Sequence, residues 1–157
     1  MTPCIKIAQK AGIAYQLHEY VHDPSRESYG AEAAEKLGVP EERLFKTLIV
    51  SLDSRDLAVG LVPVSSMLNM KRIAKAAGAK KAGMAAAADV ERSTGYVLGG
   101  VSPLGQKKRL KTIIDSSAQD FSTIYVSAGR RGLQIELSPD DLRRLTGGAF
   151  ASICQEG

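Results

Sequence analysis

Residues 44–64 read LFKTLIVSLDSRDLAVGLVPV, and they predict the central element of the fold. The two halves of this stretch, residues 44–52 and 57–64, are dominated by apolar and β-branched side chains, which is typical of strands. The polar residues 53–56 between them include two aspartates and predict a turn. The stretch therefore predicts a β-hairpin of two long strands.

Further strand and helix signals lie on both sides of this hairpin. Strands are predicted at residues 15–22, 96–101, 111–114, 123–127, 133–137 and 149–153. Helices are predicted at residues 3–12, 29–37, 70–78, 85–92 and 139–146, several with a capping residue before them or a glycine after them. Because strands outnumber helices and do not alternate with them regularly, an α+β fold is expected rather than a doubly wound parallel sheet.

The size and composition of the chain indicate one globular domain spanning residues 1–157. It has 157 residues, 44% hydrophobic and 24% charged, close to the average of globular proteins. Its apolar runs are far shorter than the ~18 residues of a membrane span, and its first residues lack the pattern of a secretory signal. The two cysteines, Cys4 and Cys154, lie at opposite ends of the sequence, so neither has a nearby partner in the sequence. This favours two reduced thiols in a reducing compartment. A soluble cytoplasmic protein without a membrane partner is expected.

The positive charge is concentrated in one central segment. The whole chain has a net charge of +4, whereas residues 71–111 contain ten basic and two acidic side chains. Such a segment attracts polyanions, of which nucleic acid is the commonest, although a solvated surface explains the charge equally well. Only 5% of the residues are aromatic, and there is no Trp, which argues against a protein that stacks many single-stranded bases.

One lysine lies on an otherwise apolar strand face. Side chains alternate between the two faces of a strand, so Lys46 shares its face with Leu44, Leu48 and Val50. Such a lysine either extends along the apolar surface into solvent or sits in a pocket as an anchor for a phosphate or a carbonyl oxygen. The strand pattern alone favours the first interpretation.

Two glycine-rich loops are further candidates for binding an anion. Residues 99–105, GGVSPLG, are followed by the basic run QKKR, and residues 127–132 read SAGRRG. Glycines allow a ligand to approach backbone N–H groups, and paired arginines can hold a phosphate. Neither loop matches the Walker or dinucleotide-binding pattern, and ordinary turns remain an alternative for both.

The sequence contains no recognisable metal site or nucleophile motif. His18 and His22 would share a strand face with Tyr20, but no third ligand has a suitable spacing. The glycine-flanked serines lack the pattern of a nucleophile elbow. Neither a metal nor another cofactor is therefore expected.

Four stretches together resemble the bacterial prolyl-tRNA editing family: FKT at residues 45–47, RSTGY at 92–96, GGVSPLGQKKR at 99–109 and VSAGRRGL at 126–133. The similarity runs in order along essentially the whole chain and points to the free-standing Cys-tRNA(Pro) deacylases, also called YbaK or EbsC. It implies an α+β domain built on a curved mixed β-sheet approaching a barrel, surrounded by helices.

The resemblance also implies an activity. Enzymes of this kind clear Cys-tRNA(Pro), which arises because cysteine and proline are too similar in size for a synthetase pocket to separate well. The thiol of the bound cysteine attacks its own ester and leaves as a cyclic thioester, so that the protein supplies position and charge stabilisation only. The implied partners are mischarged tRNA and prolyl-tRNA synthetase, and not DNA.

The resemblance assigns roles to individual residues. Lys46 matches the functional lysine of the family and is expected to bind the phosphate of the 3′-terminal adenosine or a polarised oxygen. The implied catalytic residues are Lys46, Gly99 and Gly100. The implied substrate-binding residues are Tyr20, Tyr29, Thr47, Ser102, Pro103, Ser127 and Gln134. The expected tRNA-binding residues are Lys107, Lys108, Arg109, Arg130 and Arg131.

Two positions depart from the family pattern. Gln134 stands where relatives carry Asp, so the hydrogen bonds remain but the charge that would hold the substrate α-amino group is lost. Glu136 lies two residues further on the same strand face and could replace that charge. Tyr29 stands where relatives often carry Phe. Two alternatives to the deacylase remain open: a non-catalytic tRNA- or nucleotide-binding module, and an editing domain that prefers alanine or serine.

Overall fold

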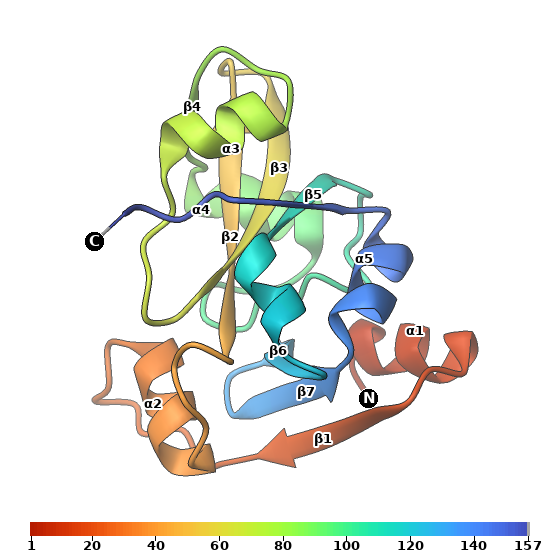
Figure 1. Ribbon diagram of the computed structural model, residues 1–157. Coiled ribbons are helices and arrows are strands. Elements are labelled where there is room, and N and C mark those ends of the chain that lie inside the picture. Colours follow the sequence, from red (N-terminus) through yellow and green to blue (C-terminus); the bar gives the residue numbers. More distant parts are fainter. Residues whose placement is uncertain (157) are drawn as a thin grey trace.

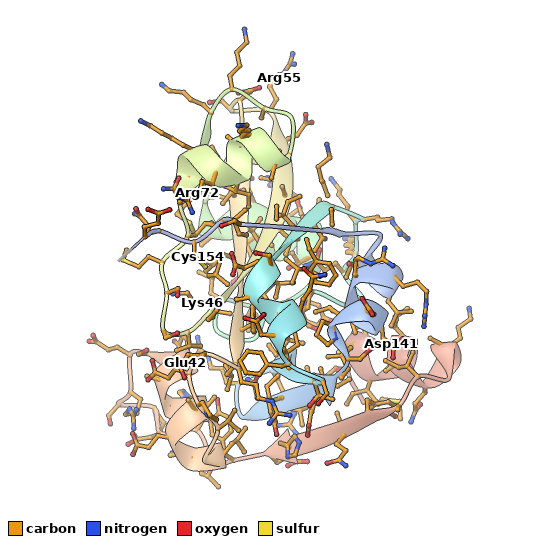
Figure 2. All side chains as sticks on the ribbon, in the orientation of Figure 1. Glu42, Lys46, Arg55, Arg72, Asp141 and Cys154 are labelled. Carbon is orange, nitrogen blue, oxygen red and sulfur yellow. The ribbon has the colours of Figure 1, made fainter. Side chains whose placement is uncertain are left out.

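The predicted hairpin lies at the centre of the larger of two β-sheets (Figure 1). In this computed structural model, which describes residues 1–156, strand β2 (Phe45–Leu52) pairs antiparallel with β3 (Asp56–Pro63) along their full lengths. The turn between them contains Asp53 and Ser54 with positive φ angles of 52° and 56°. Figure 2 shows Arg55 at this turn, at the far end of β2 from Lys46.

The larger sheet is mixed and the smaller one is antiparallel. Short strand β4 (Ala82–Met84) pairs with β2 on one side of the hairpin, and β5 (Lys111–Asp115) and β8 (Ala149–Ala151) add in parallel beyond β3. The smaller sheet has the order β1 (Tyr15–Glu19), β7 (Leu133–Leu137), β6 (Ile124–Arg130). The predicted α+β class is therefore confirmed.

The expectation of one curved sheet approaching a barrel is wrong, because the strands of residues 1–156 form two sheets and neither closes into a barrel. The two sheets meet at one corner, where Leu44 forms a single parallel bridge with Tyr125 and the Tyr125 N–H donates to the Arg43 carbonyl oxygen at 3.1 Å. Beyond this point β2 pairs with β3 and β4 instead of β6. Strand β2 thus belongs to the larger sheet along its full length.

The predicted helices all form, although the one predicted at residues 85–92 lies at 87–94, and those predicted at 3–12 and 70–78 end one and two residues earlier. The helices are α1 (Pro3–Ala11), α2 (Tyr29–Leu37), α3 (Met70–Ala76), α4 (Ala87–Thr94), the 3-10 helix η1 (Ser116–Asp120) and α5 (Pro139–Thr146). The side chains of Thr2, Asn69 and Ser138 accept hydrogen bonds from the first turns of α1, α3 and α5. No helix within residues 1–156 is long and apolar enough to cross a membrane.

The predicted strand at residues 96–101 does not form. Tyr96 is buried and its hydroxyl donates to the Leu104 carbonyl oxygen at 2.6 Å, so that the segment folds back on itself. The Gly100 N–H donates to the Val97 carbonyl oxygen, and Gly99 has a φ of 87°, which reverses the chain. Residues 97–100 are therefore a turn, hereafter the 97–100 turn. The first strand is also shorter than predicted and ends at Glu19.

Both faces of the central hairpin are covered, which explains its nearly continuous apolar sequence. Phe45, Ile49 and Leu61 belong to a core shared with α1 and the smaller sheet. The alternate residues, among them Val50 and Val62, pack in a second core that includes side chains of α3. Lys46 lies on the face of this second core, and Thr47 on the opposite face.

Candidate active site

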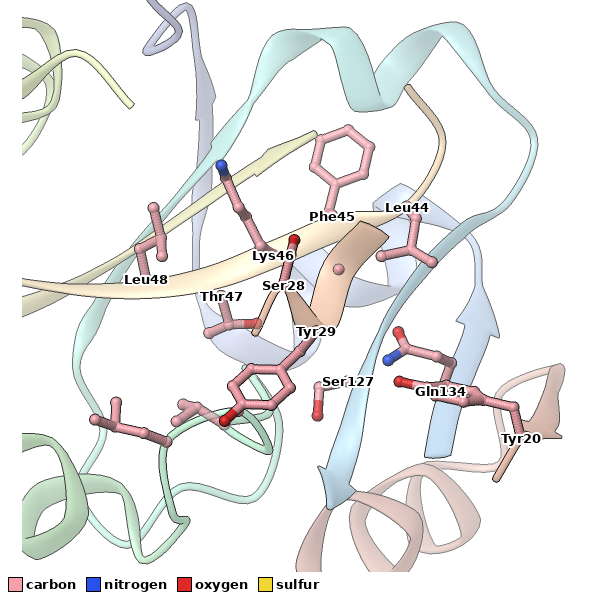
Figure 3. A pocket seen from close by; sticks show the side chains of 14 residues that line it. Tyr20, Ser28, Tyr29, Leu44, Phe45, Lys46, Thr47, Leu48, Ser127 and Gln134 are labelled. Atoms are coloured by element: carbon pink, nitrogen blue, oxygen red, sulfur yellow. The ribbon is translucent and has the colours of Figure 1, made fainter. Parts of the chain in front are cut away.

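A cavity of about 300 Å³ opens at the start of β2. It lies between β2, the N-terminal end of α2, the 97–100 turn and the paired strands β6 and β7 (Figure 3). Its lining residues are Tyr20, Ser28, Tyr29, Gly30, Leu44, Phe45, Lys46, Thr47, Leu48, Leu98, Gly99, Val101, Ser127 and Gln134. The structure thus brings together seven of the residues that the resemblance singled out, from five separate regions of the sequence.

Two buried polar atoms in this cavity have no hydrogen-bond partner among the described residues. They are the Thr47 Oγ1 and the Gln134 Oε1 atoms, and Gln134 is only 8% exposed. A buried polar atom left unpaired costs about 1–3 kcal/mol, so such atoms usually have a partner in the functional state of a protein. Thr47 and Gln134 therefore indicate where a polar ligand would bind.

Lys46 stands at the same end of β2, where its side chain leaves the strand on the side opposite to Thr47 (Figure 3). It is half-buried, and burial lowers the pKa of its ammonium group below the usual value, although Cys154 and Glu41 act on this pKa in the opposite direction. Among residues 1–156 it forms no ion pair. A partly desolvated cation without a counterion interacts strongly with an anion that enters the cavity.

The two glycines of the 97–100 turn are required by packing. A Cβ atom on Gly99 would lie 2.7 Å from the Tyr29 ring, and a Cβ atom on Gly100 would lie 2.9 Å from the Arg130 Cα atom. The turn therefore rests directly on the backbone at residues 130–131. Gly99 lines the cavity, whereas Gly100 is buried behind it.

Arg131 fixes the turn to α2 at the edge of the cavity. Its guanidinium carbon lies 4.4 Å from the centre of the Tyr29 ring, within the range of a cation–π interaction. The same guanidinium donates a hydrogen bond of 2.9 Å to the Leu98 carbonyl oxygen. Since a guanidinium has five N–H donors, further donors of Arg131 remain for a ligand.

A buried carboxylate holds the irregular segment of residues 20–28, which carries Tyr20 and leads into Tyr29. Glu32 is fully buried and accepts hydrogen bonds from the Asp23 N–H at 2.7 Å and the Lys36 Nζ atom at 2.9 Å, and its other oxygen lies 2.6 Å from the His22 Nδ1 atom. Burial alone would raise the pKa of Glu32, but these donors lower it to about 2. The sequence interpretation missed this role, because no local pattern distinguishes the buried Glu32 from the exposed Glu35 on the same helix.

Three of the expected contributors lie away from the cavity. The Ser102 hydroxyl is buried and accepts a hydrogen bond from the Leu104 N–H at 3.2 Å. Pro103 lines a second cavity of about 160 Å³ on another part of the molecule. Glu136 cannot supply the charge missing at Gln134, because its oxygens interact with His18 at 2.9 Å and Thr123 at 2.6 Å, outside the cavity. The predicted strand face shared by the histidines is also wrong, since His22 lies beyond β1.

The expected tRNA-binding residues fall into two groups. Arg130 and Arg131 are exposed beside the 97–100 turn, and Arg130 lies 3.7 Å from Glu19. Lys107, Lys108 and Arg109 are exposed between α4 and β5, and do not line the cavity that holds Lys46. In the described part of the chain, no group of three or more His, Cys, Asp or Glu side chains is arranged to hold a metal ion.

Comparison with known proteins defines the class to which this fold and cavity belong. The family described as the aminoacyl-tRNA editing domain matches residues 23–145, and the chain belongs to this family. A protein of Enterococcus faecalis, EbsC, is 39% identical over 153 residues, which are 97% of this chain and 92% of that protein. Its name describes it as a candidate Cys-tRNA(Pro)/Cys-tRNA(Cys) deacylase. The family resemblance found in the sequence is therefore confirmed.

Two further similar proteins have names that refer to prolyl-tRNA synthesis. The proline–tRNA ligase of Trichlorobacter lovleyi is 28% identical over 120 residues, covering 76% of this chain but only 21% of the ligase. The crystal structure of a candidate trans-editing enzyme for prolyl-tRNA synthetase matches with a TM-score of 0.80 over 99% of both chains. At 20% sequence identity, this second match establishes the shared fold.

Proposed function

We propose that this chain is a trans-editing deacylase whose preferred substrate is Cys-tRNA(Pro). The thiolate sulfur of the esterified cysteine attacks its own carbonyl carbon, forming a carbon–sulfur bond. The ester bond to the ribose oxygen then breaks, and that oxygen takes up the proton that the thiol gave up. The products are a cyclic thioester of cysteine and tRNA with a free terminal hydroxyl group.

The observation that carries this proposal is the composition of the cavity wall. None of the residues that line it is Asp, Glu, His or Cys, so the wall offers no carboxylate or imidazole base and no thiol. The chain's own thiols are also unsuited to attack, since burial raises the pKa of both Cys4 and Cys154 to about 11. A free thiol has a pKa of ~8.5, so a small fraction of a substrate cysteine is already thiolate at neutral pH without a protein base.

The remaining groups of the cavity match what such a reaction needs from the protein. The Lys46 ammonium group would bind the phosphate of the terminal nucleotide or stabilise the negative charge that develops on the ester oxygen. The unpaired Gln134 Oε1 atom can accept a hydrogen bond from the α-amino group, and Thr47 can bind a second polar atom of the aminoacyl group. The similarity to part of a proline–tRNA ligase supports prolyl-tRNA synthetase as the source of the substrate.

The test is the release of amino acid from a panel of tRNA(Pro) charged with cysteine, alanine, serine or proline. Cysteine is expected to be released much faster than serine, because a hydroxyl group of the same length is far less acidic than a thiol. Alkylation of the substrate thiol is expected to stop the reaction, while replacement of both Cys4 and Cys154 by Ala leaves it unchanged.

Two results would contradict the proposal. Rapid release of serine or of alkylated cysteine would mean that an activated water molecule attacks the ester. Binding of tRNA without the release of any amino acid would mean that the chain is a non-catalytic module.

A further inference from the structure

The tip of the central hairpin carries a cluster of basic side chains that the cavity does not use. The five residues of this tip patch are Arg55, Lys71, Lys75, Lys80 and Lys81, and all five are exposed. Lys71 and Lys75 lie four residues apart on α3 and so share one face of the helix. Figure 2 shows Arg55 at the tip with other nitrogen-ended side chains projecting around it.

The backbone of the patch is fixed to the hairpin turn. The Asp53 carboxylate accepts hydrogen bonds from the Lys80 N–H at 3.0 Å and the Lys81 N–H at 2.8 Å. In return the Asp53 N–H donates to the Lys81 carbonyl oxygen at 2.9 Å. The turn at residues 53–55 and the connection from α3 to β4 therefore hold their cations together in one place.

The charges of the tip patch are not neutralised by ion pairs. None of the five residues forms an ion pair with any residue that the structure describes, whereas the neighbouring Arg72 pairs with Glu156 at 2.7 Å. The nearby acidic groups are Asp53, which is already bound to two backbone N–H groups, the exposed Asp56, and Glu156, which lies near Lys75 but pairs with Arg72. A positive potential therefore remains around the patch, and at physiological salt it extends ~8 Å before screening weakens it.

The tip patch and the cavity lie at opposite ends of the same strand. Lys46 stands near the start of β2, and Leu52 at its end precedes the turn with Arg55. Six residue steps along a strand span roughly 20 Å. Because β2 is paired with β3 along its full length, the strand stays extended and this spacing is fixed. A ligand that touches both places must therefore be long and carry negative charge over that length.

We propose that the tip patch binds the phosphate backbone of the tRNA body while the acylated 3′ end occupies the cavity. This inference rests on the proposed function and adds a second contact to it. Ammonium groups on flexible stems are point charges that suit successive phosphates, and the converging N–H groups of Lys80 and Lys81 are already bound to Asp53 and do not select a small anion. The patch lengthens the stay of a charged tRNA on the protein without taking part in the chemistry.

The test compares full-length charged tRNA with a short charged substrate that lacks the tRNA body. In the tip variant, Lys71, Lys75, Lys80 and Lys81 are all replaced by Gln. Its kcat/KM for Cys-tRNA(Pro) is expected to fall about tenfold or more, with the loss in KM. Each lost phosphate contact should also reduce the slope of log Kd against log salt concentration by roughly 0.7–0.9. Turnover of a cysteinyl-CCA trinucleotide, which lacks the body, is expected to stay unchanged.

A matched pair of double variants controls for the general loss of charge. Lys71→Gln with Lys75→Gln removes two exposed lysines four residues apart on α3, and Lys6→Gln with Lys10→Gln does the same on α1. Only the α3 pair is expected to weaken the binding of tRNA. An equal effect of both pairs, or an unchanged salt slope in the tip variant, would overturn the proposal. The second result is also the one expected if the patch serves an acidic protein.

The same measurements distinguish failure of the deacylase proposal from failure of the patch proposal. If the wild-type chain binds tRNA but releases no amino acid, the deacylase proposal fails, while the salt dependence of binding by the tip variant still tests the patch. If the wild-type chain clears Cys-tRNA(Pro) and the tip variant does so equally well, the deacylase proposal stands and the patch proposal fails.

Discussion

At the scale of single residues, the charge on Lys46 is the feature of the cavity that is most open to test. In the variants Lys46→Ala and Lys46→Met, deacylation is expected to fall by about 30-fold or more. That factor corresponds to about 2 kcal/mol of lost stabilisation of a developing charge in a partly desolvated cavity. The melting temperature is expected to change little, because Lys46 forms no ion pair with another described residue.

The methionine variant separates the charge from the stem. Methionine keeps an apolar chain against the second core beside Leu48 but removes the ammonium group. Turnover near the wild-type rate in Lys46→Met would return Lys46 to the simpler interpretation, a lysine whose stem covers apolar surface.

The position of Lys46 was predictable from sequence, whereas that of its neighbours in the cavity was only partly so. Strand alternation correctly places Lys46 and Thr47 on opposite faces of β2. The same reasoning cannot tell which side of a glycine-rich loop faces a cavity. Ser102 follows Gly99 by three residues, yet it points into the core because Gly99 reverses the chain. Such reversals depend on contacts with Tyr29 and Arg131, which are remote in sequence.

At the scale of elements, the arrangement of α2 and residues 20–28 depends on the Glu32 carboxylate. The pKa of Glu32 is about 2 in the folded chain, against an ordinary value of 4.5. The unfolded state therefore binds more protons in that range, so the stability that Glu32 contributes is complete above pH 4.5 and is lost as the pH falls towards 2. Glu32→Gln is expected to lower the free energy of unfolding at pH 7, and the difference from wild type should shrink as the pH falls to 3.

A neighbouring carboxylate on the same helix serves as the control. Glu35 is exposed and lies 3.4 Å from Arg26, so Glu35→Gln is expected to have little effect on stability at any pH. The free energy of unfolding of both variants is measured by urea denaturation at pH 7 and at pH 3. A Glu32→Gln chain as stable as wild type at pH 7 would show that other contacts hold residues 20–28.

The elements that sequence predicts best are those with a local physical cause. Helices α1, α3 and α5 have capping side chains within the sequence that forms them, and the hairpin has two long apolar strands. The predicted strand at residues 96–101 fails because its apolar side chains, such as Tyr96, are buried as part of a loop. Strand β4 has only three residues and exists through its pairing with β2, so no local signal marks it.

At the scale of the whole molecule, folding divides the basic segment of residues 71–111 between two places. Its α3 and β4 part joins Arg55 in the tip patch, while Lys107, Lys108 and Arg109 lie between α4 and β5. No sequence pattern predicts this division, because it depends on how the larger sheet separates α3 from α4. The total charge of the segment therefore says less about tRNA binding than the position of each half.

The second half of the basic segment is the run Lys107, Lys108 and Arg109. Neutralising all three is expected to weaken tRNA binding and to reduce the slope of log Kd against log salt concentration by roughly 0.9 or less for each lost phosphate contact. Arg109 also lies against Gly147 at the end of α5, so its replacement disturbs packing as well as charge. The variant Lys107→Gln with Lys108→Gln avoids that effect, and its slope is measured beside that of the tip variant. If the tip patch and Lys107 with Lys108 contact the same tRNA, the two reductions in slope add in a variant that combines the substitutions. A wild-type slope in the Lys107 and Lys108 variant would mean that this half of the segment faces away from the bound tRNA.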